Sequence, residues 1–171
     1  MTTVGHGRGG GISGGGTITN STISGNVAIN GSSICATGTV QLGDTILNSG
    51  ANIFLLGSGT VTSHGYNLSD DNGGGFLTGP GDQINTDPLL GPLQDNGGPT
   101  FTHELLPGSP AIDMGDPNFT PPPTYDERGN PFVRVFGGRI DIGSFEVQAT
   151  PIPRATPTPR PRPTPRPRPL D

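Results

Sequence analysis

Two short stretches of the sequence combine carboxylates with glycine in a way that suits a hard cation. Residues 70–73 read Asp-Asp-Asn-Gly and residues 95–97 read Asp-Asn-Gly. Oxygen ligands beside flexible backbone favour calcium, so Asp70, Asp71 and Asp95 are the candidate ligands. Neither stretch has the DxDxDG spacing of an EF-hand or the GGxGxD nonapeptide repeat. Because Asp and Asn before glycine also form solvated turns, a turn is the favoured interpretation, and calcium is the only cofactor that these residues suggest.

Acid–base chemistry is the second kind of reactivity that the sequence offers. Paired carboxylates, or carboxylates with His103 as a general base, would suit polysaccharide cleavage. Carboxylates gather after residue 76, but several precede Pro or Asn, where turn chemistry accounts for them. Asp44 is the only carboxylate before Leu68, and His64, beside a glycine, is expected to be a solvated turn residue. The sequence therefore predicts no catalytic residue.

A repeat organises the part of the chain before Gly73. The triplet Gly-Thr-Ile or Gly-Thr-Val begins at Gly16, Gly38 and Gly59, so the spacing is first 22 (38 − 16) and then 21 (59 − 38). Such a period, with β-branched residues and no helical pattern, is typical of a solenoid of short strands. We predict a parallel β-helix of about three coils over residues 1–75. A disordered Gly/Ser/Thr-rich chain is the alternative.

Stacking of the repeats predicts which side chains lie above one another. Asn26 is expected over Asn48, with side-chain amides hydrogen-bonded along the stack. The expected aliphatic ladders are Ile12 over Ile34 over Leu55, Ile18 over Val40 over Val61, and Ile23 with Ile46 continued by Tyr66 or Leu68.

Residues 76–149 lose the repeat and are predicted to form an irregular C-terminal cap. Prolines recur in residues 84–116 and prevent a long helix or a central strand, so this stretch should turn repeatedly and cover the last coil. Turn residues at 95–98 are expected to join two short strands. Alternating apolar residues predict further strands at 132–136 and 139–147.

The polar residues of the repeats and of the cap are thus assigned structural roles in corners, turns and short strands. Lone Cys35 excludes an intrachain disulfide and is expected to be a small strand residue. The residues with an expected structural role are Asn26, Asn48, Asp95, Asn96, Gly97, Gly98, His103, Asp113, Asp126, Arg128, Asp141 and Glu146.

Three strings in this order resemble a known family. They are GTVTSHGYNLSDD, INTDPLLGPLQDNGGPTFTHELLPGSPAIDMGD and DERGNPFVRVFGGRIDIGSFE. Together with the preceding repeats they resemble, over residues 9–147, the choice-of-anchor Q domain that closes right-handed, pectin-lyase-like parallel β-helices of bacterial surface proteins. The resemblance implies an extracellular or cell-surface protein whose C-terminus is attached by one of several anchoring devices. It also makes the polysaccharide lyases and glycoside hydrolases of the pectin-lyase-like fold a rival class.

Charge is unevenly distributed along the chain. Residues 1–150 hold four arginines and 13 carboxylates (4 − 13 = −9), whereas residues 151–171 hold five arginines and one carboxylate (5 − 1 = +4). An acidic body argues against specific nucleic-acid binding. Proline alternates with Arg or Thr in residues 150–171, which predicts a disordered, polyproline-type spacer able to contact anionic surfaces.

No apolar run reaches the length of a transmembrane segment, and no signal peptide is evident. Because the repeat pattern starts almost at Met1, an upstream part of the chain is expected. The predicted function is that of a non-enzymatic secreted or cell-surface protein in adhesion, glycan binding or surface display, with polysaccharides or cell-envelope polymers as partners. A relative of a polysaccharide-cleaving enzyme and a structural spacer without a ligand are the alternatives.

Overall fold

The computed structural model describes residues 10–148, and this part of the chain is all-β, as predicted. The expectations for residues 1–9 and for the Pro/Arg-rich tail lie outside the described residues. The elements are β1 (Ile12–Thr19), β2 (Thr22–Ser24), β3 (Ile34–Gly43), β4 (Ile46–Asn48), β5 (Ile53–Leu55), β6 (Thr60–Gly65), β7 (Leu68–Ser69), the 3-10 turn η1 (Gly73–Gly75), β8 (Leu90–Gln94) and β9 (Thr102–Leu105).

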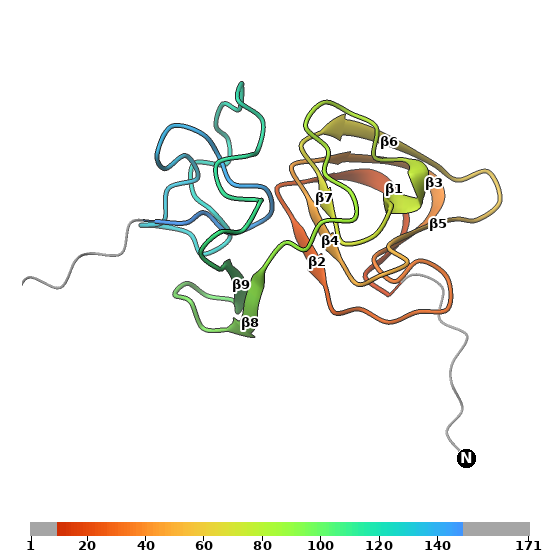
Figure 1. Ribbon diagram of the computed structural model, residues 1–171, viewed down its shortest axis with the longest axis horizontal. Coiled ribbons are helices and arrows are strands. Elements are labelled where there is room, and N and C mark those ends of the chain that lie inside the picture. Colours follow the sequence, from red (N-terminus) through yellow and green to blue (C-terminus); the bar gives the residue numbers. More distant parts are fainter. Residues whose placement is uncertain (1–9, 149–171) are drawn as a thin grey trace, which may run out of the picture.

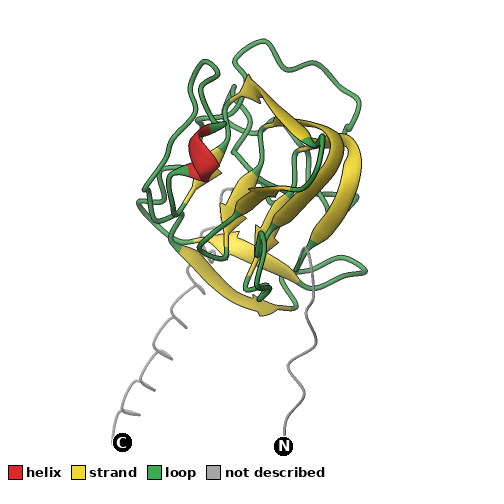
Figure 2. Cartoon of the chain, turned by 90° about the vertical axis from the view of Figure 1, so that its right-hand side faces the viewer, coloured by secondary structure: helices red, strands yellow, loops and turns green. Residues whose placement is uncertain are grey.

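The repeats form two parallel sheets. One sheet contains β1, β3, β5 and β6, and the other contains β2, β4 and β7. The first half of β3 pairs with β5 and its second half pairs with β6, while β1 lies on the opposite edge of β3. Strands of successive repeats therefore lie side by side (Figure 1), with connecting loops at their ends (Figure 2). The predicted pairs Ile12 with Ile34 and Val40 with Val61 are found.

The register between β1 and β3 shifts within the strands. The sequence numbers of paired residues differ by 22 at Ile12 and Ile34 (34 − 12) but by 24 at Ile18 and Leu42 (42 − 18). The predicted stacking of Ile18 on Val40 is therefore wrong. The shift falls around Gly15, where an added Cβ would lie 2.9 Å from a backbone oxygen of β3. A side chain would prevent this close approach, which explains the glycine at position 15.

The aliphatic ladders differ from the prediction at two other places. Ile53 lies beside Ile34, and the expected Leu55 lies further along the same strand, beside Ala36. Ile23 lies beside Leu47 because the shift in register continues into β2 and β4, where Thr22 faces Ile46. The predicted contact of Ile46 with Leu68 is found.

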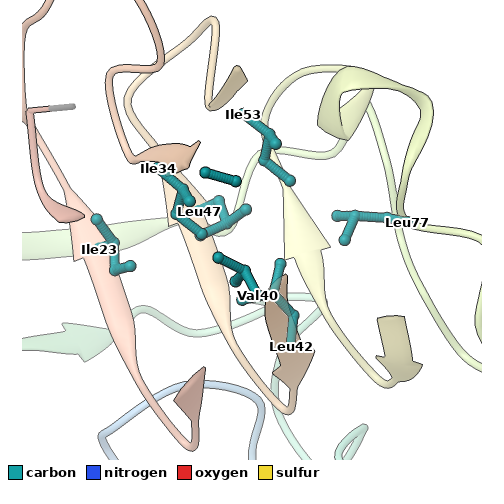
Figure 3. Packing of buried hydrophobic residues seen from close by; sticks show 8 residues of the cluster. Ile23, Ile34, Val40, Leu42, Leu47, Ile53 and Leu77 are labelled. Atoms are coloured by element: carbon teal, nitrogen blue, oxygen red, sulfur yellow. The ribbon is translucent and has the colours of Figure 1, made fainter. Parts of the chain in front are cut away.

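The sheet of β2, β4 and β7 is apolar on both faces. Side chains alternate across a strand, so Leu47 joins the cluster between the two sheets while its neighbour Ile46 faces the C-terminal segment. Figure 3 shows Leu47 among the interior residues. A parallel sheet is normally covered on both faces. The interior cluster consists of Ile23, Ile34, Ala36, Val40, Leu42, Leu47, Ile53 and Leu77.

The C-terminal segment, residues 90–148, packs along the side of the stacked strands. In Figure 1 its teal and blue loops lie beside the half formed by β1 to β7. It contacts the first repeat through Ser144, whose amide donates to Thr22 Oγ1 (3.1 Å), and the second through Gly143, whose amide donates to the Asp44 carbonyl (2.9 Å). Its buried apolar residues Leu105, Ala111, Ile142 and Phe145 pack on Ile46 and Leu68.

A shorter segment, residues 76–83, covers the last repeat. Leu77 enters the interior cluster, and the carbonyl groups of Pro80 and Gln83 accept hydrogen bonds from the amides of Tyr66 and Ser69, both at 2.8 Å. The structure therefore differs from the expectation that residues 84–116 cover the last coil, because most of their apolar contacts lie on the outer face of β4 and β7.

The predicted hairpin is found, but the two later strands are not. Strands β8 and β9 pair in antiparallel orientation across residues 95–98. In residues 132–147 there is a single bridge, between Tyr125 and Val133. Two amides of this stretch donate to a carboxylate instead: those of Phe136 and Asp141 bind Glu146 at 2.9 and 3.0 Å.

Candidate functional site

Asn52 is the centre of a buried polar network at a corner of the stack. Its side chain is fully buried. The Oδ1 atom accepts hydrogen bonds from Ser33 Oγ (2.6 Å) and from the Ser49 amide (3.0 Å), and Nδ2 donates to Asp70 Oδ1 and Asp71 Oδ1. Because Ser33 and Ser49 flank β3 and β4 whereas Asp70 and Asp71 follow β7, this side-chain amide ties successive layers together.

Asn67 forms a second network of the same kind. It is also fully buried. Its Oδ1 accepts a hydrogen bond from the Thr45 amide (3.1 Å), and its Nδ2 donates to Asp82 Oδ1 (3.0 Å), while Asp82 Oδ2 accepts one from Ser63 Oγ (2.6 Å). Buried polar groups are normally hydrogen-bonded, and both asparagines meet this requirement. They lie at two corners of the stack, directly before β5 and directly before β7.

The predicted ladder of Asn26 over Asn48 is wrong. Asn48 faces Ser24, with a hydrogen bond of 3.4 Å from Nδ2 to Ser24 Oγ, and Asn26 meets Ser49 through its backbone amide at 3.2 Å. The cause is the shift in register between the first two repeats, which begins around Gly15. Partners in β2 and β4 differ by 24 in sequence number (46 − 22), whereas the two asparagines differ by 22 (48 − 26).

The carboxylates proposed as calcium ligands are engaged by donors. Asp71 accepts hydrogen bonds from the backbone amide of Asn52 (2.8 Å), from Ser69 Oγ (2.7 Å) and from the backbone amide of Gly73 (2.8 Å). Burial opposes its charge, but these bonds outweigh burial and lower the pKa of Asp71. Asp70 accepts from the Gly50 amide.

The third calcium candidate, Asp95, is exposed and lies elsewhere in the fold. Its Oδ1 accepts a hydrogen bond from the Gly97 amide (3.0 Å), which is the turn predicted from the sequence. Within residues 10–148, no group of three or more His, Cys, Asp or Glu side chains is arranged to hold a metal ion.

Asp126 and Arg128 form a buried ion pair in the C-terminal segment. Arg128 Nη2 lies 2.6 Å from Asp126 Oδ2, and the side chains are 5% and 0% exposed. Arg128 also donates to the Glu146 carbonyl (2.6 Å) and lies between the rings of Phe132 and Phe145, 3.8 Å from each centroid. The faces of the guanidinium thus contact aromatic rings, and its edge donates hydrogen bonds to Asp126 and to the Glu146 carbonyl. Lysine, which has no planar group, cannot make this set of contacts.

Arg134, Asp141 and Glu146 form the second half of this buried cluster. Arg134 Nη1 lies 3.8 Å from Glu146 Oε2, with both side chains 1% exposed. Arg134 Nη2 donates to the Asp141 carbonyl (2.9 Å) and to Asn20 Oδ1 (2.8 Å). Asp141 accepts hydrogen bonds from the amides of Asp113 (2.7 Å) and Val147 (2.6 Å).

The cluster holds one more carboxylate than it holds arginines. Asp126, Asp141 and Glu146 face Arg128 and Arg134, so full ionisation leaves a buried charge of −1 (2 − 3). Burial raises the pKa of Glu146 to about 7, against hydrogen bonds from two backbone amides, and burial also raises the pKa of Asp141. Loss of solvation on burial is the main cause of the Glu146 shift, and the nearby charge of Asp141 adds to it. A proton on Glu146 makes the cluster neutral.

We expect the free energy of unfolding to increase as pH falls from about 7 to about 5. The pKa of Glu146 in the folded protein lies above its ordinary value of 4.5, so the folded state binds this proton more readily than the unfolded chain in that window. The slope approaches about 1.4 kcal/mol per pH unit for one proton. Burial also raises the pKa of Asp44, which acts in the same direction, whereas the lowered pKa of Asp71 means that its contribution is lost as the pH falls further.

Urea unfolding at several pH values between about 5 and about 8 measures this slope. Glu146→Gln, which keeps the shape and cannot ionise, is expected to flatten the slope. A stability that falls steadily from about pH 7 to about pH 5 would contradict the prediction.

A groove runs along the junction between the first repeat and the C-terminal segment. It consists of three adjoining cavities of about 280, 360 and 370 Å³. The first two share Asn20, Ser21, Glu127 and Ser144, and the first and third share Thr22, Leu93 and His103. The shared lining residues show that the cavities adjoin one another.

Two exposed aromatic rings lie along this groove. Phe101, in the first cavity, is 66% exposed, and Tyr125, in the second, is 38% exposed. Leu93, in the first and third cavities, is also largely exposed. A gathering of exposed apolar side chains in a concave surface is typical of a binding site.

Polar side chains lie between the two rings. Arg134 holds Asn20 by its Oδ1, and within residues 10–148 the Asn20 Nδ2 donates to no acceptor, so it is available to a ligand. Glu127 is exposed and receives a long hydrogen bond of 3.4 Å from Thr100 Oγ1. Asp126 also borders the groove, but its carboxylate is buried against Arg128. The accessible groups are thus an amide, hydroxyls and one carboxylate.

The structure brings four predicted motif residues together, namely Asp126, Arg128, Asp141 and Glu146. Two others touch this cluster: Gly98 packs on the Arg128 backbone, and the backbone amide of Asp113 donates to Asp141 Oδ1 (2.7 Å). His103 and Asn96 bond elsewhere: His103 Nδ1 lies 2.7 Å from the Gly91 carbonyl on β8, and Asn96 Nδ2 donates to the Thr102 carbonyl (2.8 Å).

Sequence reasoning missed Arg134, Asn52, Asn67 and the groove. A charged residue in the centre of Phe-Val-Arg-Val-Phe, on the same side as both Phe residues, was the signal for Arg134. Asn52 and Asn67 each precede an aliphatic residue that begins a strand.

Comparisons with models of protein families, with curated protein sequences and with solved structures found no match. Among the described residues, no helix is long and apolar enough to cross a membrane.

Proposed function

We propose that this chain is a non-enzymatic, secreted or cell-surface protein of the right-handed parallel β-helix type that binds a glycan in the junction groove. The β-helix assignment is supported by parallel pairing of strands at the period of the sequence repeat. It is also supported by the resemblance of residues 9–147 to the choice-of-anchor Q domain. The extracellular setting rests on that resemblance.

The groove with its two exposed rings is the observation that carries the binding proposal. The apolar face of a sugar ring packs on an aromatic ring, which gives affinity without charge. Sugar hydroxyls both donate and accept hydrogen bonds, and they match the amide of Asn20 and the carboxylate of Glu127. An exposed phenylalanine such as Phe101 has no role in the core, since it is 66% exposed.

The arrangement of carboxylates favours binding over cleavage. Glycoside hydrolysis needs two carboxyl groups separated by roughly 5–10 Å on either side of the bond. Of the two carboxylates that border the groove, Asp126 is 0% exposed and paired with Arg128, which leaves Glu127 accessible. Turnover of a polysaccharide that is lost in Glu127→Gln would favour the enzymatic alternative.

Replacing Phe101 with alanine is expected to weaken glycan binding at least about fivefold, which corresponds to about 1 kcal/mol of stacking. The free energy of unfolding should change by less than about 0.5 kcal/mol because the ring is exposed. Phe54→Ala is the matched control, because Phe54 is exposed on β5 and borders none of the three cavities.

A glycan microarray read at equal protein concentration tests this proposal. Loss of signal in Phe101→Ala with retention in Phe54→Ala supports the groove. Equal loss in both variants would contradict it. Absence of binding by the unaltered protein would favour the structural spacer.

A further inference from the structure

We infer that the ligand of the groove is a linear, uncharged polysaccharide that lies across both aromatic rings. This inference rests on the proposed glycan binding and specifies the class of glycan. It has two parts, the absence of charge and the extended shape, which different features of the groove support.

The groove offers no exposed cation to a uronate or sulfate group. Among the residues that border the three cavities, Arg134 is the only arginine, and its side chain is 1% exposed. Its Nη2 donates to Asn20 and to the Asp141 carbonyl, whereas Nε and Nη1 are buried without a hydrogen-bond partner and Nη1 lies 3.8 Å from Glu146. His103 directs Nδ1 to the Gly91 carbonyl. Recognition of an anionic sugar normally uses exposed arginine or lysine.

The electrostatic field around the groove also opposes an anionic ligand. Glu127 is exposed at its centre. The surrounding body is acidic, with four arginines against 13 carboxylates in residues 1–150. A polyanion would meet the exposed carboxylate of Glu127 and the net negative charge of the body, whereas an uncharged chain would meet no such repulsion.

The extended shape follows from the order of the groups along the groove. Tyr125 borders the second cavity and Phe101 the first, and Asn20, Ser21 and Glu127 border both. A chain that stacks on both rings must therefore pass these polar groups, which lie where the hydroxyls of the intervening sugar units would be. A single sugar unit would stack on one ring, whereas a longer chain can contact both.

Affinity electrophoresis in gels containing a single polysaccharide separates the outcomes. The probes are uncharged β-glucan, xylan and mannan, and the acidic polygalacturonate and alginate. Measurements at about 0.5 M salt, where the screening length is roughly 4 Å, suppress attraction of acidic polymers to the arginines of the tail. We expect retardation by at least one uncharged polymer, reduced at least about fivefold in Phe101→Ala and in Tyr125→Ala.

A hexasaccharide of the retained polymer should bind at least about tenfold more tightly than its disaccharide. Asn20→Asp, which keeps the oxygen that Arg134 binds and removes the amide donor, should weaken binding without loss of folding. Retardation by acidic polymers alone, lost in Phe101→Ala, would overturn this inference and leave the proposed glycan binding intact. Equal affinity for disaccharide and hexasaccharide would overturn the extended mode. No retardation by any polymer would overturn both proposals.

Discussion

Replacing Arg128 with methionine is expected to lower the free energy of unfolding by about 3–5 kcal/mol, which is enough to unfold a marginally stable domain. The substitution leaves the Asp126 carboxylate, which is fully buried, without its counter-ion. It also removes the cation from between the rings of Phe132 and Phe145. Loss of one member of a buried pair costs more than loss of both, because the remaining charge has no compensation.

Arg139→Met is the matched control for this prediction. Arg139 donates to the carbonyl groups of Met114 and Gly115 and forms no ion pair with a carboxylate of the described residues. We expect it to cost no more than about 1.5 kcal/mol. The double variant Asp126→Asn with Arg128→Met should be more stable than Arg128→Met alone. Urea unfolding measures all three, and equal costs for Arg128→Met and Arg139→Met would refute the role of the ion pair.

Replacing Asn52 with alanine is expected to cost about 2–4 kcal/mol, because a buried amide that serves several partners cannot be replaced by water. Ser33 Oγ and the Ser49 amide lose their acceptor, and Asp70 and Asp71 lose a donor. Asn52→Asp should be at least as harmful, since it places a third carboxylate against two others.

Asn48→Ala serves as the control for the corner asparagine. Asn48 is half-buried, and its side chain makes one hydrogen bond of 3.4 Å. The expected cost is below about 1 kcal/mol. Thermal or urea unfolding of the two variants distinguishes a corner network from an asparagine ladder, because a ladder would make Asn48 the more sensitive position.

The all-β class, the pairing of repeats and the turn at residues 95–98 could all be predicted from the residues, because they follow from local rules. The period of the repeat brings like residues of successive strands together, as Val40 and Val61 show. Asp-Asn-Gly turns bond their own backbone without help from distant residues, as Asp95 does with Gly97.

The register and the position of the C-terminal segment depended on packing between distant parts of the chain. The shift around Gly15 moves every later partner between the first two repeats, and nothing in the repeat marks it, because it depends on how closely two backbones approach. It therefore separates Asn26 from Asn48.

The buried cluster and the groove likewise arise from contacts that only the folded chain makes. Arg134 binds Asn20 across 114 positions of the chain, and Ser144 binds Thr22 across 122. The alternation of residues 132–136 indicated a strand, but the Arg134 amide donates to the Thr124 carbonyl and the Phe136 amide donates to the Glu146 carboxylate. Such long-range polar contacts have no period in the sequence. The same packing of the C-terminal segment on the first repeat creates the groove that Phe101 and Tyr125 border.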